Sequence, residues 1–458
     1  MLSAFDFDAL RAREFARLDA QDISYLDFAA SGLYGQSQLD AYAARLARNV
    51  YGNPHSAHAP SLASTDDIAR AKAAVLAFYD ADPDLYEVCL TANTSAALKL
   101  VAESYPFAPR RPLVISADNH NSVVGMRQYA AAKNAATAIL PLDDTLRLTQ
   151  PAERLARLAL RDGPGLLAFP LQSNFSGVKH QLDLIPAAQA LGYDVLLDAA
   201  AGGPTGGVNL REHPVEFLAC AFYKLFGLPT GLGALIAKRT ALARLQRPWF
   251  AGGTVDFVSV ALARHRLRDG HEGFEDGTPN FLAAGAVESG FSLLATVPRA
   301  ALQARLEVLM ARFLDGAAAL RHADGAPKVQ LYGPRDLQGR GATVAFNLLA
   351  RDGRCLPYAG FEEHAQALRV AVRGGCFCNP GAGEQAFGFS RRGVDACLDR
   401  LSDRFNHARF QQCLGQDATV GALRMSLGLP SNAADVDRLL AAIDVFSESE
   451  AVARTAVT

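Results

Sequence analysis

The alternation of apolar and polar positions divides most of the chain into short strands and helices. From Glu87 onward, short apolar runs alternate with longer stretches whose apolar residues recur at helical spacing. We predict strands at 88–90, 113–116, 166–170, 195–197, 218–222 and 234–237, with helices at 64–78, 95–104 and 122–133. Such alternation is typical of an α/β fold, in which helices flank a mainly parallel central sheet.

The pattern changes near residue 290, where a long helical stretch over 297–322 begins. After it we predict strands at 328–332, 343–348, 369–373 and 423–427, and helices at 362–368 and 435–446. We therefore expect three parts: an N-terminal helix and strand segment (1–40) joining the small domain, a large domain (41–290), and a smaller α+β C-terminal domain (291–458) that carries a cysteine loop.

Composition and charge exclude two classes of partner. Lys and Arg number 45 against 47 Asp and Glu, so the net charge is −2 and no basic field is expected to attract nucleic acid. No uninterrupted apolar run is long enough to span a bilayer, and the charged N-terminus reads as a helix and not a signal peptide. The seven cysteines are an odd number without secretory context, which predicts reduced thiols in the cytoplasm.

Polar residues follow the carboxyl ends of successive predicted strands. In the order of the strands, these are Asn93, Thr94 and Ser95, followed by His120, Asn174, Asp198 and Lys224. Each has a plain structural alternative, such as a helix cap, a turn or a solvated loop. Because ligands bind at the carboxyl ends of strands in such sheets, we interpret the set together as one site. The small polar residues 93–95 open a helix, where free NH groups suit a phosphate.

Lys224 lies at the end of an apolar run and before the glycines 227, 231 and 233. Taken alone it is more simply explained as a surface lysine after an edge strand. Apolar surroundings, however, lower the pKa of a lysine and make its amine available for an imine. A lysine, an aspartate and a phosphate cradle at one sheet edge indicate pyridoxal phosphate (PLP), with Asp198 on the ring nitrogen, His120 on the ring face and Asn174 on the ring hydroxyl.

Five segments carry a resemblance to a known family. They are FYKLFGLPTGLGAL (222–235), RGGCFCNPGA (373–382), YGNPHS (51–56), FEDGTPNF (274–281) and LRMSLG (423–428). The chain resembles a class V PLP-dependent enzyme of fold type I, and specifically the cysteine desulfurase domain of molybdenum cofactor sulfurases. The resemblance extends over nearly the whole chain. We expect no counterpart of the further carboxy-terminal domain of those sulfurases.

The resemblance implies roles for the cofactor residues. The large domain would bind PLP, Lys224 would form the imine and shuttle protons, and Tyr223 would lie beside it. His120 would be both a catalytic and a cofactor-binding residue. The phosphate would be held by Asn93, Thr94 and Ser95. Gly277 and Thr278 would reach the phosphate of a partner subunit, which implies a homodimer.

The sulfur chemistry would use a different loop. The resemblance implies removal of sulfur from L-cysteine, leaving alanine and an enzyme persulfide that is passed to a separate acceptor such as molybdenum cofactor. Cys378 is the expected nucleophile, and Cys376 is the alternative. Arg424 would bind the substrate carboxylate, because a guanidinium matches a carboxylate with two hydrogen bonds, and Arg373 would assist it or close the loop. No metal is expected, because the Cys-x-Cys pair lacks a second pair at suitable spacing.

Two other functions stay open at this point. One is another class V PLP reaction, such as an aminotransferase, a C–S lyase or an epimerase acting on an amino acid or a sulfur metabolite. The other is a scaffold that retains the fold without catalysis. The presence of both Lys224 and Asp198 argues against the scaffold.

Overall fold

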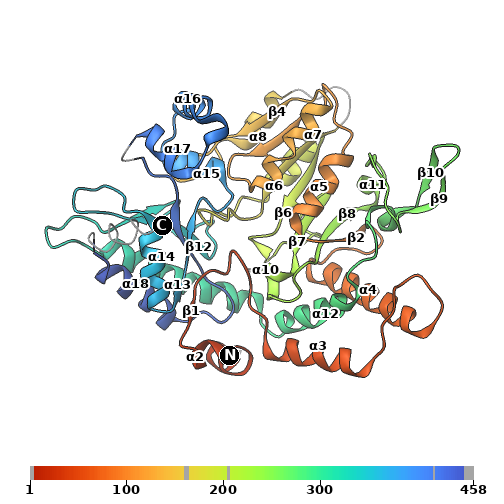
Figure 1. The fold of residues 1–458 in the computed structure, drawn as a ribbon, viewed down its shortest axis with the longest axis horizontal. Helices are drawn as coiled ribbons and strands as arrows, with labels where there is room; N and C mark the ends of the chain where they lie inside the picture. Colours follow the sequence, from red (N-terminus) through yellow and green to blue (C-terminus); the bar gives the residue numbers. More distant parts are fainter. Residues whose placement is uncertain (1–4, 159–163, 204–206, 416–417, 448–458) are drawn as a thin grey trace.

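The structure is a computed structural model that describes residues 5–158, 164–203, 207–415 and 418–447. A seven-stranded sheet and a four-stranded sheet lie at its centre, with helices around both (Figure 1). The larger sheet has the order β2 (Tyr86–Thr91), β8 (Gly233–Lys238), β7 (Phe217–Ala221), β6 (Tyr193–Asp198), β5 (Gly165–Pro170), β3 (Leu113–Ser116) and β4 (Thr137–Leu140).

Most strands of the larger sheet are parallel. From β7 through β6, β5 and β3 to β4 every pairing is parallel, whereas β8 is antiparallel to both of its neighbours. The carboxyl ends of the parallel strands therefore meet at one edge of the sheet. The predicted α/β class, with a mainly parallel central sheet flanked by helices, is confirmed.

The two faces of this sheet bury separate hydrophobic cores. In β5, Leu167 and Phe169 point into one core and Leu166 and Ala168 into the other, since successive side chains of a strand alternate between faces. The first face is covered by α4 (Ala59–Phe78), α8 (Pro151–Arg157), α9 (Leu184–Ala190) and α12 (Phe281–Ala295). The second is covered by α5 (Thr94–Ser104), α7 (Arg127–Ala132) and α11 (Arg239–Leu242).

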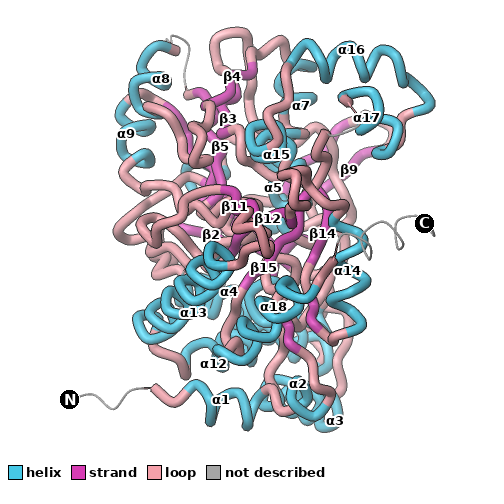
Figure 2. Tube along the Cα trace, turned by 90° about the vertical axis from the view of Figure 1, so that its left-hand side faces the viewer, coloured by secondary structure: helices cyan, strands magenta, loops and turns pink. Residues whose placement is uncertain are grey.

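The four-stranded sheet is antiparallel and lies next to the larger one. Its order is β11 (Val329–Tyr332), β12 (Thr343–Leu348), β15 (Ala422–Ser426) and β14 (Arg373–Gly375). Figure 2 shows α13 (Arg299–Ala319) and α18 (Ala433–Val445) side by side against it, and both contribute to its core with α14 (Tyr358–Ala367). The remaining helices here are α15 (Pro380–Ala386), α16 (Arg391–Leu401), η3 (Ser402–Arg404) and α17 (His407–Leu414).

The N-terminal segment packs beside the smaller sheet, and the chain then continues to the part that contains the larger sheet. The segment contains α1 (Phe7–Glu14), α2 (Arg17–Ala20) and β1 (Ser24–Tyr25), and β1 pairs in parallel with β13 (Val370–Ala371). The chain then continues into α3 (Gln36–Arg48). The predicted domain boundaries stay predictions, and their outer ends, residues 1–4 and 448–458, lie outside the described residues.

Several predicted elements differ from the observed ones. The helix predicted at 122–133 is two short helices, α6 (Asn121–Val124) and α7, because the chain turns at Gly125. The strand predicted at 218–222 ends at Ala221, and Lys224 lies on the single-turn helix α10 (Phe222–Phe226). β4 was not predicted although residues 138–140 form a short apolar run, and the hairpin of β9 (Val255–Ser259) and β10 (Arg264–Leu267) was not predicted because these largely exposed strands lack a continuous apolar run. The 3₁₀ turn η2 (Gly270–Phe274) follows the hairpin.

The sequence led us to expect that all cysteines are reduced thiols, but two of them form a disulfide. Cys397 on α16 and Cys413 on α17 form a disulfide, with their Cα atoms 5.7 Å apart. The turn between the two helices folds them against each other and brings together two residues that are 16 positions apart. Cys89 and Cys220 are buried free thiols, whereas Cys355 is only partly buried.

No single helix in the described ranges is both long and apolar enough to cross a membrane. Taken together, α12 and α13 satisfy the criteria of length and composition, but they meet at an angle of 75°. Many residues of α12 are buried against the larger sheet and its helices, as expected of a core helix.

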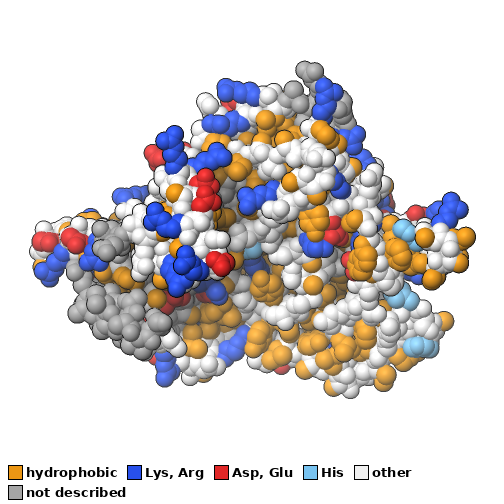
Figure 3. Space-filling view, turned by 45° about the horizontal axis from the view of Figure 1, so that its top comes forward, with side chains coloured by type: hydrophobic (Ala, Val, Ile, Leu, Met, Phe, Trp, Pro, Cys, Tyr) orange, Lys and Arg blue, Asp and Glu red, His pale blue; other side chains and the backbone are white. Residues whose placement is uncertain are grey.

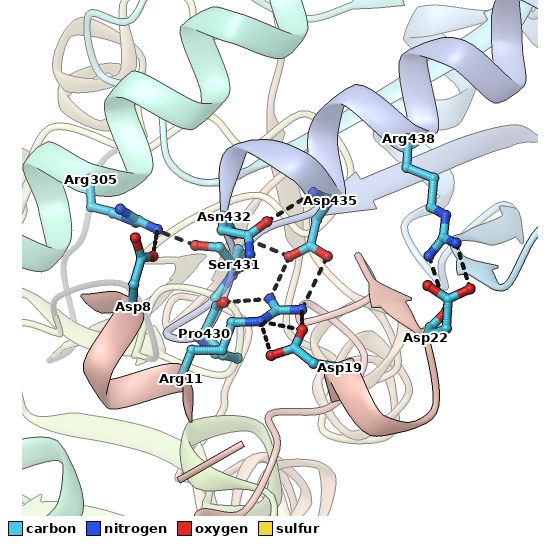
Figure 4. Close-up of polar contacts among 11 residues, drawn as sticks. Asp8, Arg11, Asp19, Asp22, Arg305, Pro430, Ser431, Asn432, Asp435 and Arg438 are labelled. Atoms are coloured by element: carbon cyan, nitrogen blue, oxygen red, sulfur yellow. Dashed lines mark hydrogen bonds and ion pairs between the residues drawn. The ribbon is translucent and has the colours of Figure 1, made fainter. Parts of the chain in front are cut away.

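A buried ion pair fixes the N-terminal segment to α18. Arg11 donates to Asp435 across 2.7 Å and to the carbonyl oxygen of Pro430 across 2.8 Å, and both charged side chains are almost fully buried. Asp19 lies on the other side of the guanidinium at 2.8 Å. Figure 4 shows these groups converging on Arg11, while the pair formed by Asp22 and Arg438 lies at the periphery.

We predict that Arg11→Ala destabilises the protein by about 3–5 kcal/mol, because it leaves the Asp435 carboxylate buried without its counter-charge. Arg438→Ala is the matched control, since it removes an exposed ion pair and should change stability far less. Urea-induced unfolding measures both. Equal effects of the two substitutions would contradict the structural role assigned to Arg11.

Candidate active site

A cavity of about 350 Å³ lies at the carboxyl ends of the parallel strands. Eight of the residues predicted for the site line it: Asn93, Thr94, Ser95, His120, Asn174, Asp198, Tyr223 and Lys224. Asp198 is the last residue of β6, and the others come from the segments that follow β2, β3, β5 and β7. The parallel arrangement of the strands thus brings together residues that are up to 131 positions apart (224 − 93 = 131).

Lys224 is held in place by a tight turn. The helix α10 ends at Gly227, which has a φ of +76°. A Cβ atom at this position would run into the backbone of Leu33 and Tyr34, so a glycine is required both by conformation and by space. The amide of Gly32 donates to the carbonyl oxygen of Tyr223 across 3.0 Å. The loop after β1 therefore packs directly against the lysine-bearing helix.

The surroundings of Lys224 favour its neutral amine. Its side chain is partly exposed and lines the cavity. Burial by the surrounding protein lowers its pKa from the ordinary lysine value, and the negative charge of Asp198 partly opposes this shift. The lowered pKa predicted from the sequence is confirmed in direction. A neutral amine at this position is able to attack a carbonyl carbon.

Asp198 and His120 complete the charged groups of the cavity. Burial raises the pKa of Asp198, while a hydrogen bond of 2.9 Å from the Ala200 amide and the charges of Lys224 and His120 lower it. Burial and the charge of Lys224 lower the pKa of His120. The Ser122 amide donates to His120 Nδ1 across 3.1 Å, so the neutral imidazole carries its proton on Nε2.

The start of α5 forms a cradle for an anion. Asn93 caps the helix by accepting from the Ala96 amide at 3.0 Å, and the hydroxyl oxygens of Ser95 and Ser122 lie 2.6 Å apart. The Thr94 hydroxyl is buried and has no hydrogen-bond partner among the described residues, although its residue lines the cavity. A buried hydroxyl without a partner, beside the free amides of a helix start, suits a bound phosphate. Together with Lys224 and Asp198, these donors fit PLP.

Two arginines predicted to bind substrate lie outside the lining of the cavity. Arg373 and Arg424 are directly opposite each other on β14 and β15, and Asp27 bridges them. The distances from the Asp27 carboxylate are 2.7 Å to Arg373 and 3.1 Å to Arg424. Burial lowers the pKa of Arg424, and Asp27 opposes this shift. Arg424 Nε is buried without a partner among the described residues.

The two candidate nucleophiles lie between β14 and α15. Cys378 is exposed, whereas Cys376 is partly buried, and burial raises the pKa of the Cys376 thiol. Neither residue lines the cavity, but a negative charge on Cys378 is near enough to raise the pKa of Lys224. The backbone of Cys378 is bonded close to the cavity, since its carbonyl oxygen accepts from the amide of Asn121, the neighbour of His120, across 2.7 Å.

Gly277 and Thr278 are exposed and do not line the cavity of their own chain. The Asn53 amide lies 3.4 Å from the Thr278 hydroxyl, so these two residues lie beside the loop before α4. Their predicted contact with the phosphate of a partner subunit stays a prediction.

Sequence reasoning missed several residues of the site. Ser122 and Gln172 line the cavity, and Asp27 bridges the two arginines. Ser122 lies two positions after His120 and Gln172 two positions before Asn174, so both belong to the segments after strands that the sequence pointed to, although neither was given a role. Asp27 lies far from β14 and β15 in the sequence, and it is brought there by the pairing of β1 with β13 and by its own parallel bridge to Ser426 at the end of β15.

Comparisons with known proteins are consistent with this geometry. The family model described as aminotransferase class-V matches residues 24–439. The molybdenum cofactor sulfurase of Solanum lycopersicum is 35% identical over 94% of this chain and 56% of its own length, and that of Homo sapiens is 33% identical over 94% and 50%. The chain therefore spans about half the length of the curated relatives it matches.

Solved structures share the fold. A cysteine desulfurase from Thermococcus onnurineus NA1 has a TM-score of 0.76 at 22% identity, covering 97% of this chain and 98% of its own. The cysteine desulfurase CsdA from Escherichia coli has a TM-score of 0.76 at 21% identity, covering 96% and 98%.

The lowered pKa of Lys224 leads to a prediction about reductive methylation with formaldehyde. We expect Lys224 to react faster than Lys99 at pH 7, because a lower pKa gives a larger neutral fraction. Lys99 is exposed on α5, and its hydrogen bond to Glu103 raises its pKa. The ratio of the two rates should fall as the pH approaches 10, where ordinary lysines also become neutral. Peptide mass spectrometry gives both rates, and a ratio independent of pH would rule out the depressed pKa.

Proposed function

We propose that this chain, which belongs to the class V aminotransferase family, is a PLP-dependent cysteine desulfurase that transfers sulfur to a separate acceptor. The observation that carries the proposal is the relation between Lys224 and Cys378. Lys224, whose pKa is lowered by burial, lines the cavity together with Asp198. The exposed Cys378 is held next to that cavity because Asn174, which lines it, donates to the carbonyl oxygen of Phe377 across 2.7 Å. A site of this kind joins a carbonyl-reactive amine to a sulfur-accepting group.

The lining residues would hold the cofactor in a defined orientation. Lys224 Nζ would bind its aldehyde carbon, Asp198 would face its ring nitrogen, and His120 would contact its ring. The start of α5, with the unpartnered Thr94 hydroxyl, would receive its phosphate. When bound, PLP withdraws electrons from the α-carbon of an amino acid.

Protons and sulfur would be handled by the protein's own groups. Lys224 Nζ, once released from the cofactor, would take the α-proton of L-cysteine. The Cys378 thiolate would attack the substrate sulfur, and a new S–S bond would form on Cys378 as the substrate C–S bond breaks. The electron pair of that bond would stay with the β-carbon, which takes up a proton to become the methyl group of alanine, and Lys224 Nζ would return a proton to the α-carbon. The persulfide on Cys378 would then be available to an acceptor.

The substrate carboxylate would be bound by the arginine pair. Arg373 and Arg424 together carry two positive charges, and Asp27 neutralises one of them. The net charge of this cluster is therefore +1, which matches a single carboxylate. Nε of Arg424, which has no partner in the part of the chain that the structure describes, would supply a hydrogen bond to it. Arg373 is half-exposed and would reach a ligand more easily than the buried Arg424.

A homodimer is supported by exposed apolar side chains on one part of the surface. Figure 3 shows hydrophobic side chains on the β9–β10 hairpin, which projects at the right. Trp249, Phe257, Val260 and Leu262 lie on or near it and are 60%, 64%, 96% and 68% exposed. Leu39, Leu46 and Val50 add apolar surface on and after α3. Such surface favours burial against a second copy, which would place Gly277 and Thr278 near the partner's cavity.

The sulfur acceptor would be a separate molecule, and molybdenum cofactor is the candidate that the relatives named above suggest. A cytoplasmic location remains a prediction from the cysteine content. The Cys397–Cys413 disulfide weakens its basis, which was a fully reduced set of thiols.

We predict that the protein with PLP and a thiol reductant converts L-cysteine to alanine and sulfide in equal amounts. Cys378→Ala should lower the rate by about 100-fold or more, because it removes the atom that receives the sulfur. Cys376→Ala, two positions away, should retain most of the rate. Amino-acid analysis and sulfide release give the result.

Two outcomes would contradict this function. Full activity of Cys378→Ala would exclude its thiol as the sulfur acceptor. A requirement for a keto acid, with no dependence on cysteine, would instead favour an aminotransferase.

The proposed dimer predicts a difference between two Val→Glu substitutions. Val260→Glu places a charge at the tip of the hairpin and should shift the protein toward monomer, because the charge would have to be buried in the interface. Val308→Glu is the control, since Val308 is 69% exposed on α13. Sedimentation velocity distinguishes the species. A wild-type monomer at micromolar concentration would contradict the dimer.

A further inference from the structure

The backbone of the cysteine loop has an unusual conformation. Phe377 and Cys378 have φ angles of +55° and +54°, so two consecutive residues other than glycine are left-handed. Such residues adopt this region only where the surrounding structure enforces it. The contacts around the loop should therefore reveal what holds the Cys378 sulfur in position.

Both left-handed residues are bonded to the larger sheet. Asn174 Nδ2 donates to the carbonyl oxygen of Phe377 across 2.7 Å, and the Asn121 amide donates to that of Cys378 across 2.7 Å. The centre of the Phe377 ring lies 5.6 Å from that of the Phe175 ring and 4.7 Å from the guanidinium of Arg424. The loop is thus fixed to segments that follow β3 and β5.

Asn379, the next residue, is fully buried and uses both ends of its side chain. Its Nδ2 donates to the carbonyl oxygen of Asp118 across 2.7 Å and to Asn174 Oδ1 across 2.9 Å. Its Oδ1 accepts from the Ala382 amide at 3.2 Å and so caps α15. The backbone amide of Asn379 also donates to the carbonyl oxygen of Cys376 across 3.1 Å.

These bonds form a continuous connection from Asn379 to the cavity. Asn174 lines the cavity beside Lys224, accepts from Asn379 with its Oδ1, and donates to Phe377 with its Nδ2. The Asn379 donor therefore orients the Asn174 amide, since Nδ2 of one must face Oδ1 of the other. The oriented Asn174 amide in turn holds the carbonyl group next to Cys378.

We propose that Asn379 is a positioning residue for Cys378. It acts through Asn174 to hold residues 377 and 378 in the left-handed conformation, in which Cys378 is exposed and Cys376 is partly buried. The inference rests on the proposed function only in taking Cys378 as the thiol that receives sulfur. The arrangement of the loop itself stands on the hydrogen bonds alone.

Two substitutions separate this role from the helix cap. Asn379→Asp keeps the shape and the capping oxygen but replaces the donor with a carboxylate oxygen that faces Asp118 O and Asn174 Oδ1. Asn379→Ser keeps a strong capping residue and also removes the amide donor, without adding a charge. Asn406→Asp is the matched control, because Asn406 caps α17 on the surface by accepting from the Arg409 amide.

The first measurement is alkylation by iodoacetamide of the protein without cofactor, read by peptide mass spectrometry. In the wild type we expect Cys378 to react faster than Cys376, which is partly buried and has a raised thiol pKa. In Asn379→Ser and Asn379→Asp the loop should relax, and the ratio of the two rates should move toward one. Asn406→Asp should leave the ratio unchanged.

The second measurement is turnover of L-cysteine by the PLP-loaded protein. We expect both Asn379 variants to lose about 10- to 100-fold in kcat, because a displaced nucleophile reduces the fraction of productive encounters. KM should change little, because neither variant removes a group assigned to the substrate. A helix cap alone predicts that Asn379→Ser behaves as wild type in both measurements, and that result would overturn the inference.

The two proposals fail in different ways. A wild type that releases no alanine contradicts the desulfurase function, while the alkylation ratio still reports on the loop. An active wild type whose Asn379→Ser variant keeps the same kcat and the same ratio contradicts the role of Asn379 alone.

Discussion

The enclosed amine of Lys224 beside the carboxylate of Asp198 is the interaction on which the site depends. Burial favours the neutral form of each group, and each charge favours the charged form of the other. The pair is held at this point because β6 and β7 are parallel neighbours, so their carboxyl ends place the two segments at the same sheet edge. The cavity, its phosphate cradle and His120 are arranged around this pair.

The second constraint is the contact between the two sheets. The cysteine loop belongs to the smaller sheet through β14, but its conformation is fixed by Asn121 and Asn174 of the larger body. The N-terminal segment also bridges the two, since Asp27 binds Arg373 and Arg424 while Gly32 packs on α10. Cofactor site, thiol and arginines thus depend on one set of contacts between distant parts of the chain.

Local patterns predicted the parts of the site that local sequence determines. The strand at 113–116 was predicted with its observed bounds because a short apolar run between turn residues is a strong signal, and the strand-end residues followed from the parallel sheet. Lys224 was assigned to the end of a strand, since five residues of α10 are too few to show helical periodicity.

Contacts between distant segments could not be predicted in the same way. Asp27, Asn379 and the Cys397–Cys413 disulfide all depend on tertiary packing. Nothing in the residues around Asn379 indicates that its amide contacts Asn174, which lies 205 positions away. The exposed hairpin β9–β10 was missed for a different reason, because it does not bury a continuous apolar face.

The most direct test of the account is to locate the covalent bond to the cofactor. The protein is incubated with PLP, reduced with borohydride, digested and analysed by mass spectrometry. The account predicts that the pyridoxyl group is on Lys224 and that Asp198→Ala weakens its incorporation. Attachment to another lysine, or retention of PLP without a reducible bond, would contradict the central claim.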